Sequence, residues 1–299
     1  NHRGFRLDVR EEVRVLLSRE DVEFFKTHGY LVLENLFTAD DLSPVNQVIS
    51  EWVEHGKALE ESDEVIDLED THTPEKPRIR RIKRPYQNHQ VFRDFVRRPD
   101  YMGVISSLIG PNIRLHTSKL NLKLGGFGAP VQWHQDWAFY PHTNDDVLVS
   151  GVILDDMVED NGPLLVIPGS QKGPVFDHHH DGCFIGAFDT EASGLDFSKA
   201  VKLTAPTGSL VVFHSRIVHG SELNRSELPR RVLYYELTAA DAWPLGGTYS
   251  MPLIPDLNTY NELIVAGEPT LEPRLEKVPV RIPLPVPEGP QGIYILQKQ

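Results

Sequence analysis

Between residues 113 and 237 the chain contains a series of short segments in which apolar and polar residues alternate. Alternation with a period of two is typical of β-strands that bury one face. Gly, Pro and Asn turns separate the segments, which favours a sandwich or barrel over alternating strand and helix units. The predicted strands cover 113–123, 147–154, 164–168, 209–213 and 231–237. The sequence therefore predicts a mainly β core.

Helix signals precede this β region. Ser18 is followed by Asp21 and Thr38 by Asp41, and both pairs match the capping box that begins a helix. Gly29 would end the first helix. The predicted elements before the core are helices at 19–28, 39–53 and 92–109, with a strand at 30–33 between the first two.

The length of 299 residues suits one large domain. We expect a single domain over 1–299, with a mainly helical part at 1–110, the β core at 111–240 and a C-terminal extension at 241–299. The extension is rich in proline from Pro252 onward and is expected to wrap the surface without regular structure. We find no internal repeat.

The composition narrows the class of partner. A formal net charge of −13 argues against a general binder of nucleic acid or of anionic membranes. No apolar run approaches the ~20 residues that a membrane helix needs. The single cysteine, Cys183, excludes an intrachain disulfide and fits a reducing cytoplasm. A small-molecule substrate is therefore expected, and the sequence does not choose between a monomer and a homodimer.

The stretch 131–137 contains His134 and Asp136, which would leave the same face of a strand. An imidazole and a carboxylate together suit a first-row divalent metal. A second histidine would complete the two-histidine, one-carboxylate set of non-haem Fe(II) oxygenases, which leaves coordination positions open. A lone His-x-Asp is more often a surface hydrogen-bonded pair, so the metal hypothesis depends on a third ligand.

The third ligand is expected on a distant strand of the same barrel. His214 and His219 both lie at or just beyond the end of an apolar strand, and their spacing does not choose between them. A cation is also needed for the far carboxylate of a dicarboxylate co-substrate. Arg230 or Arg231 could supply a bidentate guanidinium at the start of the next strand.

Two charged regions and a histidine run have less specific interpretations. The chain is acidic at 60–70 and basic at 76–84, which usually indicates solvated loops. A lid over 60–90, or contact of the basic run with an anionic substrate, is the less favoured alternative. Adjacent histidines alternate in direction, so 178–180 is expected to form a polar loop near the mouth of the site, in which a contact with substrate is left open, rather than a second metal site.

Several motifs in one order resemble the phytanoyl-CoA dioxygenase family. They are Trp133-His134-Gln135-Asp136-Trp137, Tyr140-Pro141-His142, Asp160-Asn161-Gly162-Pro163-Leu164, Ile167-Pro168-Gly169-Ser170, His219-Gly220-Ser221 and Pro229-Arg230. The resemblance extends from the N-terminal helix to about Leu237. It implies a double-stranded β-helix, a cupin-like jelly roll, that uses Fe(II), 2-oxoglutarate and O2.

By position, the resemblance also implies roles for individual residues. His134, Asp136 and His219 would hold the iron. Arg230 would pair with the C5 carboxylate of 2-oxoglutarate, Ser221 would hydrogen-bond the same carboxylate, and Asn121 would contact the co-substrate. His214 and Arg231 are then left with structural roles.

The implied reaction is hydroxylation of a small or medium organic molecule with release of succinate and CO2. An Asp at position 136 favours this outcome over halogenation, because halogenating relatives carry a small residue there. Desaturation, epoxidation or cyclisation with the same cofactors is the alternative, and a non-catalytic or non-oxidative metal-binding protein of this fold is a further one. The substrate could be an acyl-CoA, an amino-acid-like compound or a natural product.

Overall fold

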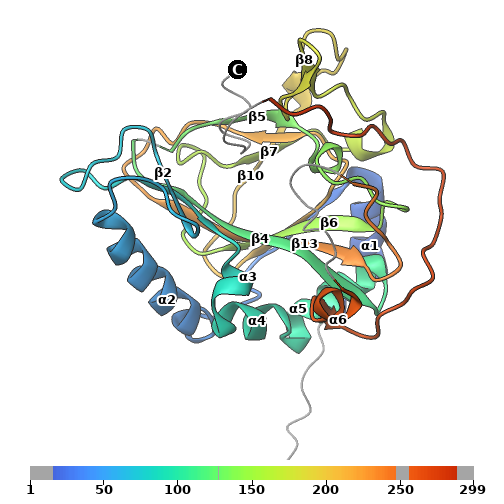
Figure 1. The fold of residues 1–299 in the computed structure, drawn as a ribbon, viewed down its shortest axis with the longest axis horizontal. Helices are drawn as coiled ribbons and strands as arrows, with labels where there is room; N and C mark the ends of the chain where they lie inside the picture. Colours follow the sequence, from blue (N-terminus) through green and yellow to red (C-terminus); the bar gives the residue numbers. More distant parts are fainter. Residues whose placement is uncertain (1–15, 127, 247–255, 288–299) are drawn as a thin grey trace, which may run out of the picture.

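A computed structural model describes residues 16–126, 128–246 and 256–287, and two antiparallel sheets face each other in it (Figure 1). The larger sheet has the strand order β1 (Tyr30–Leu33), β11 (Leu210–His214), β6 (Val147–Ile153), β13 (Arg230–Ala239), β4 (Ile113–Lys123), β3 (Ile79–Lys83), β2 (Ile66–Leu68), and β14 (Ile264–Ala266) pairs with β4. The smaller sheet is ordered β10 (Val201–Leu203), β7 (Leu164–Val166), β12 (His219–Ser221), β5 (Val131–His134). This arrangement confirms the predicted mainly β jelly roll.

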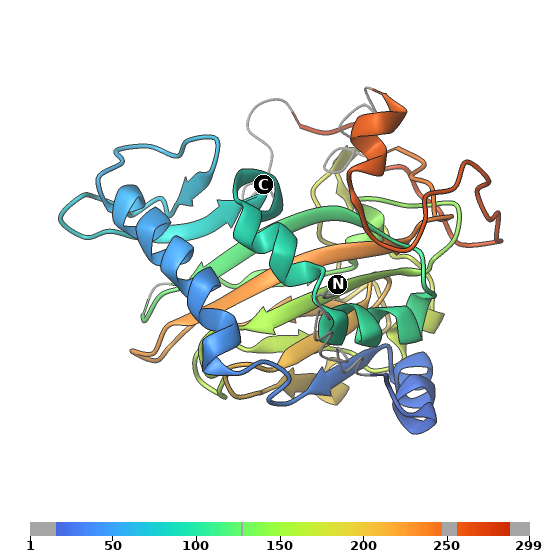
Figure 2. The same cartoon turned by 90° about the horizontal axis from the view of Figure 1, so that it is seen from below.

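The helices lie on the outer face of the larger sheet, as Figure 2 shows from below. Their bounds are α1 (Arg19–His28), α2 (Ala39–Lys57), α3 (Pro85–Asn88), α4 (Gln90–Val96), α5 (Pro99–Ile109) and α6 (Leu257–Asn261). Both predicted capping boxes are present, at Ser18 and Thr38, and Gly29 ends α1 with a φ of 80°. The helical N-terminal part is confirmed in these respects.

The predicted helix over 92–109 is wrong as a single element. The chain forms α4 and α5 instead, and Arg97 and Arg98 separate them. Pro99 is the first residue of α5, where its missing N–H would have no helical partner in any case. A proline inside one continuous helix would remove a hydrogen bond and clash with the preceding turn.

The charged region before β4 is a strand pair rather than the expected solvated loop. β2 comes from the acidic run and β3 from the basic run, and β3 extends the larger sheet beside β4. Arg80 lies 2.8 Å from Glu69, and Arg81 and Lys83 share Asp67. The opposite charges of the two runs therefore pair with each other.

The two faces of the larger sheet belong to different apolar clusters. On the outer face, Leu120 and Leu233 pack with the helices. On the inner face, Val149, Phe213 and Tyr234 pack with residues of the smaller sheet. Side chains that alternate with the outer cluster along β4 and β13 therefore point into the space between the sheets.

The segment after β13 is only partly irregular. It contributes α6 and β14, whereas residues 267–287 contain no further helix or strand. Arg274 donates to Asp241 at 3.0 Å, and the indole N–H of Trp137 donates to the carbonyl of Pro279 at 2.8 Å. Among the described residues, no helix is both long enough and apolar enough to cross a membrane.

Candidate metal centre

Strand pairing in the smaller sheet brings two histidines together. His134 ends β5, His219 begins β12, and the two are direct partners in the antiparallel pairing. Asp136 does not lie on the strand, as the sequence had suggested, but begins a short 3-10 turn, Asp136–Ala138. This turn brings the carboxylate back toward both imidazoles.

The three side chains form one compact set of ligand atoms. Oδ1 of Asp136 lies 3.5 Å from Nε2 of His134, and Oδ2 lies 3.5 Å from Nε2 of His219. All three ligand atoms lie within 4.8 Å of one another. Ligands at right angles with bonds of ~2.1 Å would be about 3 Å apart, so a small shift would accommodate one ion.

Both imidazoles are oriented for this role by the main chain. Nδ1 of His134 lies 2.8 Å from the carbonyl oxygen of Gln132, and Nδ1 of His219 lies 3.0 Å from that of Ile217. A carbonyl only accepts, so each Nδ1 carries the proton and each Nε2 keeps a free lone pair. Both free lone pairs face Asp136.

The charge state of the set also suits a cation. Burial lowers the pKa of His219 to about 3, so its imidazole is neutral near pH 7. Burial alone would raise the pKa of Asp136, but the charge of Lys119 and the nearby imidazoles outweigh it and hold that pKa well below its usual range. Oδ2 of Asp136 is buried without a hydrogen-bond partner in the described part of the chain. Such an orphaned carboxylate oxygen fits a bound metal.

Gln135, between the two ligands in sequence, is a supporting residue that the sequence analysis missed. It is fully buried, and its side chain bonds the carbonyls of Pro174 and Arg216 and the N–H of Phe176 at 2.8 to 3.1 Å. Its own N–H donates to Nε2 of His178 at 3.0 Å. The polarity of a residue inside the motif was the only available signal.

The histidine run differs from the expected polar loop. His178 is buried, and Nδ1 donates to the carbonyl of Phe176 while Nε2 accepts from Gln135. His179 and His180 form β8, which pairs with β9 (Cys183–Phe184). The expected polar loop is therefore wrong for His179 and His180, which lie in a strand. His178 does lie in an irregular segment, but it is buried and supports the backbone that carries the metal ligands.

The alternatives His214 and Arg231 lie outside the cluster. His214 ends β11, and its Nδ1 accepts from the N–H of Arg216 at 3.1 Å. The guanidinium of Arg231 forms two hydrogen bonds with Asp155, at 2.7 and 2.8 Å, through Nη2 and Nε, and its backbone N–H forms a third at 2.9 Å. Their structural roles agree with the expectation.

Arg230, Ser221 and Asn121 line one cavity with the three ligands. Nε of Arg230 and Oδ1 of Asn121 are buried and have no partner among the described residues. Burial, then the charge of Arg230, lowers the pKa of the adjacent Lys123 to about 6. Arg230 is thus a buried cation whose donor is available to an anion.

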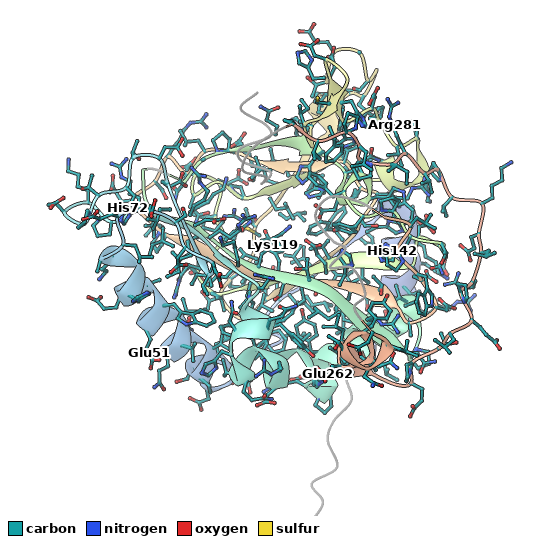
Figure 3. All side chains as sticks on the ribbon, in the orientation of Figure 1. Glu51, His72, Lys119, His142, Glu262 and Arg281 are labelled. Carbon is teal, nitrogen blue, oxygen red and sulfur yellow. The ribbon has the colours of Figure 1, made fainter. Side chains whose placement is uncertain are left out.

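Two further cations line the same cavity, Lys119 of β4 and Arg81 of β3. Lys119 lies near the centre of the molecule (Figure 3) and donates to Glu236 at 2.8 Å. Burial opposes the charge of Lys119, but Glu236 and Asp136 outweigh it and raise the pKa of the ammonium. Alternation along 113–123 could have placed Lys119 on the same face as Asn121, whereas Arg81 required knowledge of the strand pairing.

Comparison with known proteins agrees with the family that the sequence motifs resemble. The phytanoyl-CoA dioxygenase (PhyH) family model matches residues 25–232. The "Probable alpha-ketoglutarate-dependent hypophosphite dioxygenase" of Stutzerimonas stutzeri is 36% identical and covers 86% of this chain and 89% of its own length. The L-proline trans-4-hydroxylase of Streptomyces griseoviridis is 29% identical over 76% of this chain and 91% of its own.

The fold has solved counterparts as well. A crystal structure of EctD from S. alaskensis with 2-oxoglutarate and 5-hydroxyectoine superposes with a TM-score of 0.63 at 25% identity, over 88% of each chain. The chain belongs to the phytanoyl-CoA dioxygenase (PhyH) family and is an Fe(II)- and 2-oxoglutarate-dependent dioxygenase, as the resemblance of its motifs implied.

Proposed function

We propose that His134, Asp136 and His219 hold the catalytic Fe(II) of this dioxygenase. The observation that carries the proposal is the convergence of three ligand atoms within 4.8 Å. The orphaned Oδ2 of Asp136 adds to it. Because all three residues come from the same end of the β5–β12 pair and the adjoining turn, the opposite side of the metal is left for co-substrate and O2.

Arg230 and Ser221 bind the far carboxylate of 2-oxoglutarate in this proposal. Both are buried in the cavity that the metal ligands line. The guanidinium offers a fixed pair of donors, and the hydroxyl of Ser221 offers one more. The side-chain amide of Asn121 contacts the co-substrate from β4, where its orphaned Oδ1 faces the same cavity.

Iron and 2-oxoglutarate bound there supply the oxidising chemistry, in which decarboxylation of 2-oxoglutarate to succinate and CO2 is coupled to hydroxylation of the substrate. The protein holds the reactants and excludes water. Apolar side chains of Val149, Leu164, Phe213 and Tyr234 form part of the cavity wall. Because apolar side chains exclude water, side reactions of the oxidant are limited and it reacts with the positioned substrate.

The substrate is a small molecule. The relatives named above act, by their names, on hypophosphite and L-proline. We propose a compact substrate in the size range of those two, rather than the long acyl-CoA considered from the sequence, because the relative of 36% identity acts, by its name, on a very small molecule.

The whole chain acts as one domain in this proposal, over 1–299. Support comes from the C-terminal extension, because β14 pairs with β4 and the Pro279 carbonyl accepts from Trp137, next to the metal ligand Asp136. We also place the enzyme in the cytoplasm, where its one cysteine would stay reduced.

The test combines binding and turnover. Without oxygen, purified protein should bind one Fe(II), and added 2-oxoglutarate should produce a charge-transfer absorption band in the visible range. Admission of O2 with a panel of small substrates should then yield succinate at a rate that one substrate increases. Stoichiometric iron binding without any 2-oxoglutarate-dependent band would contradict the assignment of the co-substrate site.

A further inference from the structure

We propose that a second cavity is the entrance by which 2-oxoglutarate reaches the metal centre, and that Arg84, Arg93 and Arg97 attract the co-substrate there. This outer cavity is distinct from the one that the metal ligands line, and neither the metal nor the co-substrate site uses its arginines. The inference rests on the proposed function, because it supplies the path to the co-substrate site. The anion is a small dicarboxylate, since both carboxyl groups of 2-oxoglutarate are ionised near pH 7.

The outer cavity lies between α3, α4, α6 and β4. Tyr86 and Arg93 line it from the first two helices, Thr259 from α6, and His116 and Thr117 from β4. Its volume is about 590 Å³, within the range of roughly 300–1,000 Å³ that is usual for small-molecule sites. The space therefore admits a molecule of the size of 2-oxoglutarate together with some of its water shell.

Main-chain carbonyls hold two of the arginines in place. Nη1 of Arg93 donates to the carbonyls of Tyr86 and Gln87 at 2.9 and 3.1 Å. Nη2 of Arg97 donates to the hydroxyl of Tyr86 at 2.5 Å and to the carbonyl of Ile264 at 3.2 Å. In the described ranges neither arginine forms an ion pair with a carboxylate, and a carbonyl carries no net charge. Both positive charges are therefore positioned without being neutralised.

The third arginine, Arg84, has unused donors. Within the part of the chain that the structure describes, its exposed side chain forms no hydrogen bond or ion pair. Its main chain is fixed, because its N–H donates to the carbonyl of Ser118 on β4 at 3.1 Å. Its φ of 48° is a left-handed conformation that residues other than glycine rarely adopt, and such strain is often found at functional positions. The guanidinium of Arg84 is thus available to an anion at the wall of the outer cavity.

Positive charge exceeds negative charge around the outer cavity. Among its described lining residues the three arginines face one acid, Glu262, whose carboxylate forms no ion pair in the described ranges. Burial, then the charges of His142 and Lys119, lowers the pKa of His116 well below its ordinary value, so this imidazole is neutral near pH 7. The whole chain has a net charge of −13 and on average repels a dianion. A local positive region at a cavity offsets this repulsion and speeds the association of anions.

β4 joins the outer cavity to the metal centre. Thr117 lines the outer cavity, whereas Lys119 lines the cavity of the metal ligands. Their pairing with β13 is regular, so the two side chains leave the same face of the sheet about 7 Å apart. Arg230, which we assign to the far carboxylate, pairs with Lys123 further along β4. A dicarboxylate that enters at Thr117 therefore moves along β4 toward Arg230, opposite the smaller sheet that carries both histidine ligands.

Two ring side chains link the outer cavity to the metal ligands. The rings of His116 and Tyr140 have centroids 4.7 Å apart, and His116 lines the outer cavity. Burial, then the charge of the metal ligand Asp136, raises the pKa of the Tyr140 hydroxyl well above its ordinary value. The charge of Asp136 thus acts on a side chain that packs against the wall of the outer cavity. This proximity places the outer cavity beside the metal centre.

The experiment measures how fast 2-oxoglutarate binds. Protein loaded with Fe(II) is mixed with 2-oxoglutarate in an anaerobic stopped-flow instrument, and the charge-transfer band gives the association rate constant kon and the dissociation rate constant koff. Wild-type kon should fall about threefold to tenfold between about 20 mM and about 300 mM NaCl, because salt screens the attraction of exposed charges. Arg84→Gln should lower kon about threefold at the lower salt concentration, reduce its salt dependence and leave koff within about twofold.

Three further variants separate the outer cavity from general electrostatics. Arg84→Lys retains the charge and should keep kon within about twofold of wild type. Arg225→Gln is the matched control, because it removes the same charge from a side chain that is 70% exposed and does not line the outer cavity, and it should change kon less than about 1.5-fold. Thr117→Phe keeps a residue that suits a strand but places a bulky neutral side chain in the path. It should lower kon and koff about threefold or more, with their ratio within about threefold of wild type.

The outcomes distinguish this inference from the proposed function. Equal losses of kon in Arg84→Gln and Arg225→Gln, or wild-type kon in Arg84→Gln, overturn the inference while the proposed function stands. An effect of Arg84→Gln on koff alone contradicts it as well, because Arg84 would then contact bound 2-oxoglutarate. Wild-type values of kon and koff in Thr117→Phe exclude a path along this part of β4. If Fe(II)-loaded wild-type protein forms no band with 2-oxoglutarate, the proposed function itself fails.

Discussion

The imidazole rings of His134 and His219 have centroids 4.1 Å apart because the two residues are direct partners across β5 and β12. β12 also pairs with β7, so His219 is held by a hydrogen-bonded strand on each side. The position of the distal ligand is thus fixed by the smaller sheet and not by a loop. A site built on paired strands keeps its geometry before the metal arrives.

Replacing His219 by alanine should remove one of three metal ligands. We expect Fe(II) affinity to fall at least about a hundredfold, since loss of even an outer partner of a ligand commonly costs tenfold to a hundredfold. Competition with a metal-sensitive dye, under anaerobic conditions, measures this affinity directly.

His214→Ala is the matched control for His219→Ala. His214 is close in sequence but accepts a hydrogen bond from the N–H of Arg216. Its loss should leave that donor unpaired and cost about 1–2 kcal/mol of unfolding free energy, with Fe(II) affinity within about threefold of wild type. A larger loss of iron binding in His214→Ala than in His219→Ala would exchange their roles.

Arg230→Met should raise the KM for 2-oxoglutarate roughly tenfold to a hundredfold, because it removes charge-assisted hydrogen bonds to a buried carboxylate. Arg231→Met should leave that KM within about threefold. It should instead lower the unfolding free energy by about 1 kcal/mol, since it breaks the partly buried pair with Asp155. Steady-state kinetics and urea denaturation of both variants test the assignment, and a KM effect confined to Arg231→Met would reverse it.

Strand alternation and helix caps predicted most of the scaffold. They are local patterns, so β4, β6, β11 and β13 were found from sequence, as were both capping boxes. The β2–β3 pair was missed because its strands are charged, and charge normally indicates solvent. Burial of these charges is compensated by ion pairs between the two runs, in which Asp67 pairs with Arg81 and Lys83.

Only part of the metal site was predictable from the sequence. His134 and Asp136 form a local motif, but the choice of His219 over His214 depended on resemblance, since both follow the same apolar strand. The same-face argument for His134 and Asp136 was wrong in detail because the strand ends at His134. Lys119 and Arg81 were not singled out, because their convergence is set by long-range pairing across β3 and β4.

His142 should make stability depend on pH. Burial lowers its pKa to about 4 from the ordinary 6.5, while Nδ1 donates to the carbonyl of Tyr140 at 2.7 Å. Above pH 6.5 both the folded and the unfolded forms are neutral and stability is complete. As pH falls from 6.5 toward 4, the unfolded form gains a proton that the folded form refuses, and stability is lost.

From pH 7 to 5 this residue should account for about 2 kcal/mol of lost unfolding free energy. His142→Gln retains a donor for the carbonyl of Tyr140 but does not titrate. Urea denaturation at both pH values should therefore show a smaller decrease in the variant. An identical decrease in wild type and variant would assign the pH dependence to other groups.

Gln135→Leu should weaken Fe(II) binding although it replaces no metal ligand. The variant leaves the carbonyls of Pro174 and Arg216 and the N–H of Phe176 without their buried partner, at a cost of about 3 kcal/mol or more in unfolding free energy. Because Gln135 separates the two adjacent ligands in the chain, relaxation of its backbone should also misplace Asp136. We expect Fe(II) affinity to fall roughly tenfold to a hundredfold.

His178→Phe removes the acceptor for the N–H of Gln135 and should also lower both the unfolding free energy and the Fe(II) affinity. If both variants lose stability but bind Fe(II) like wild type, the network holds the fold and has no part in ordering the ligands.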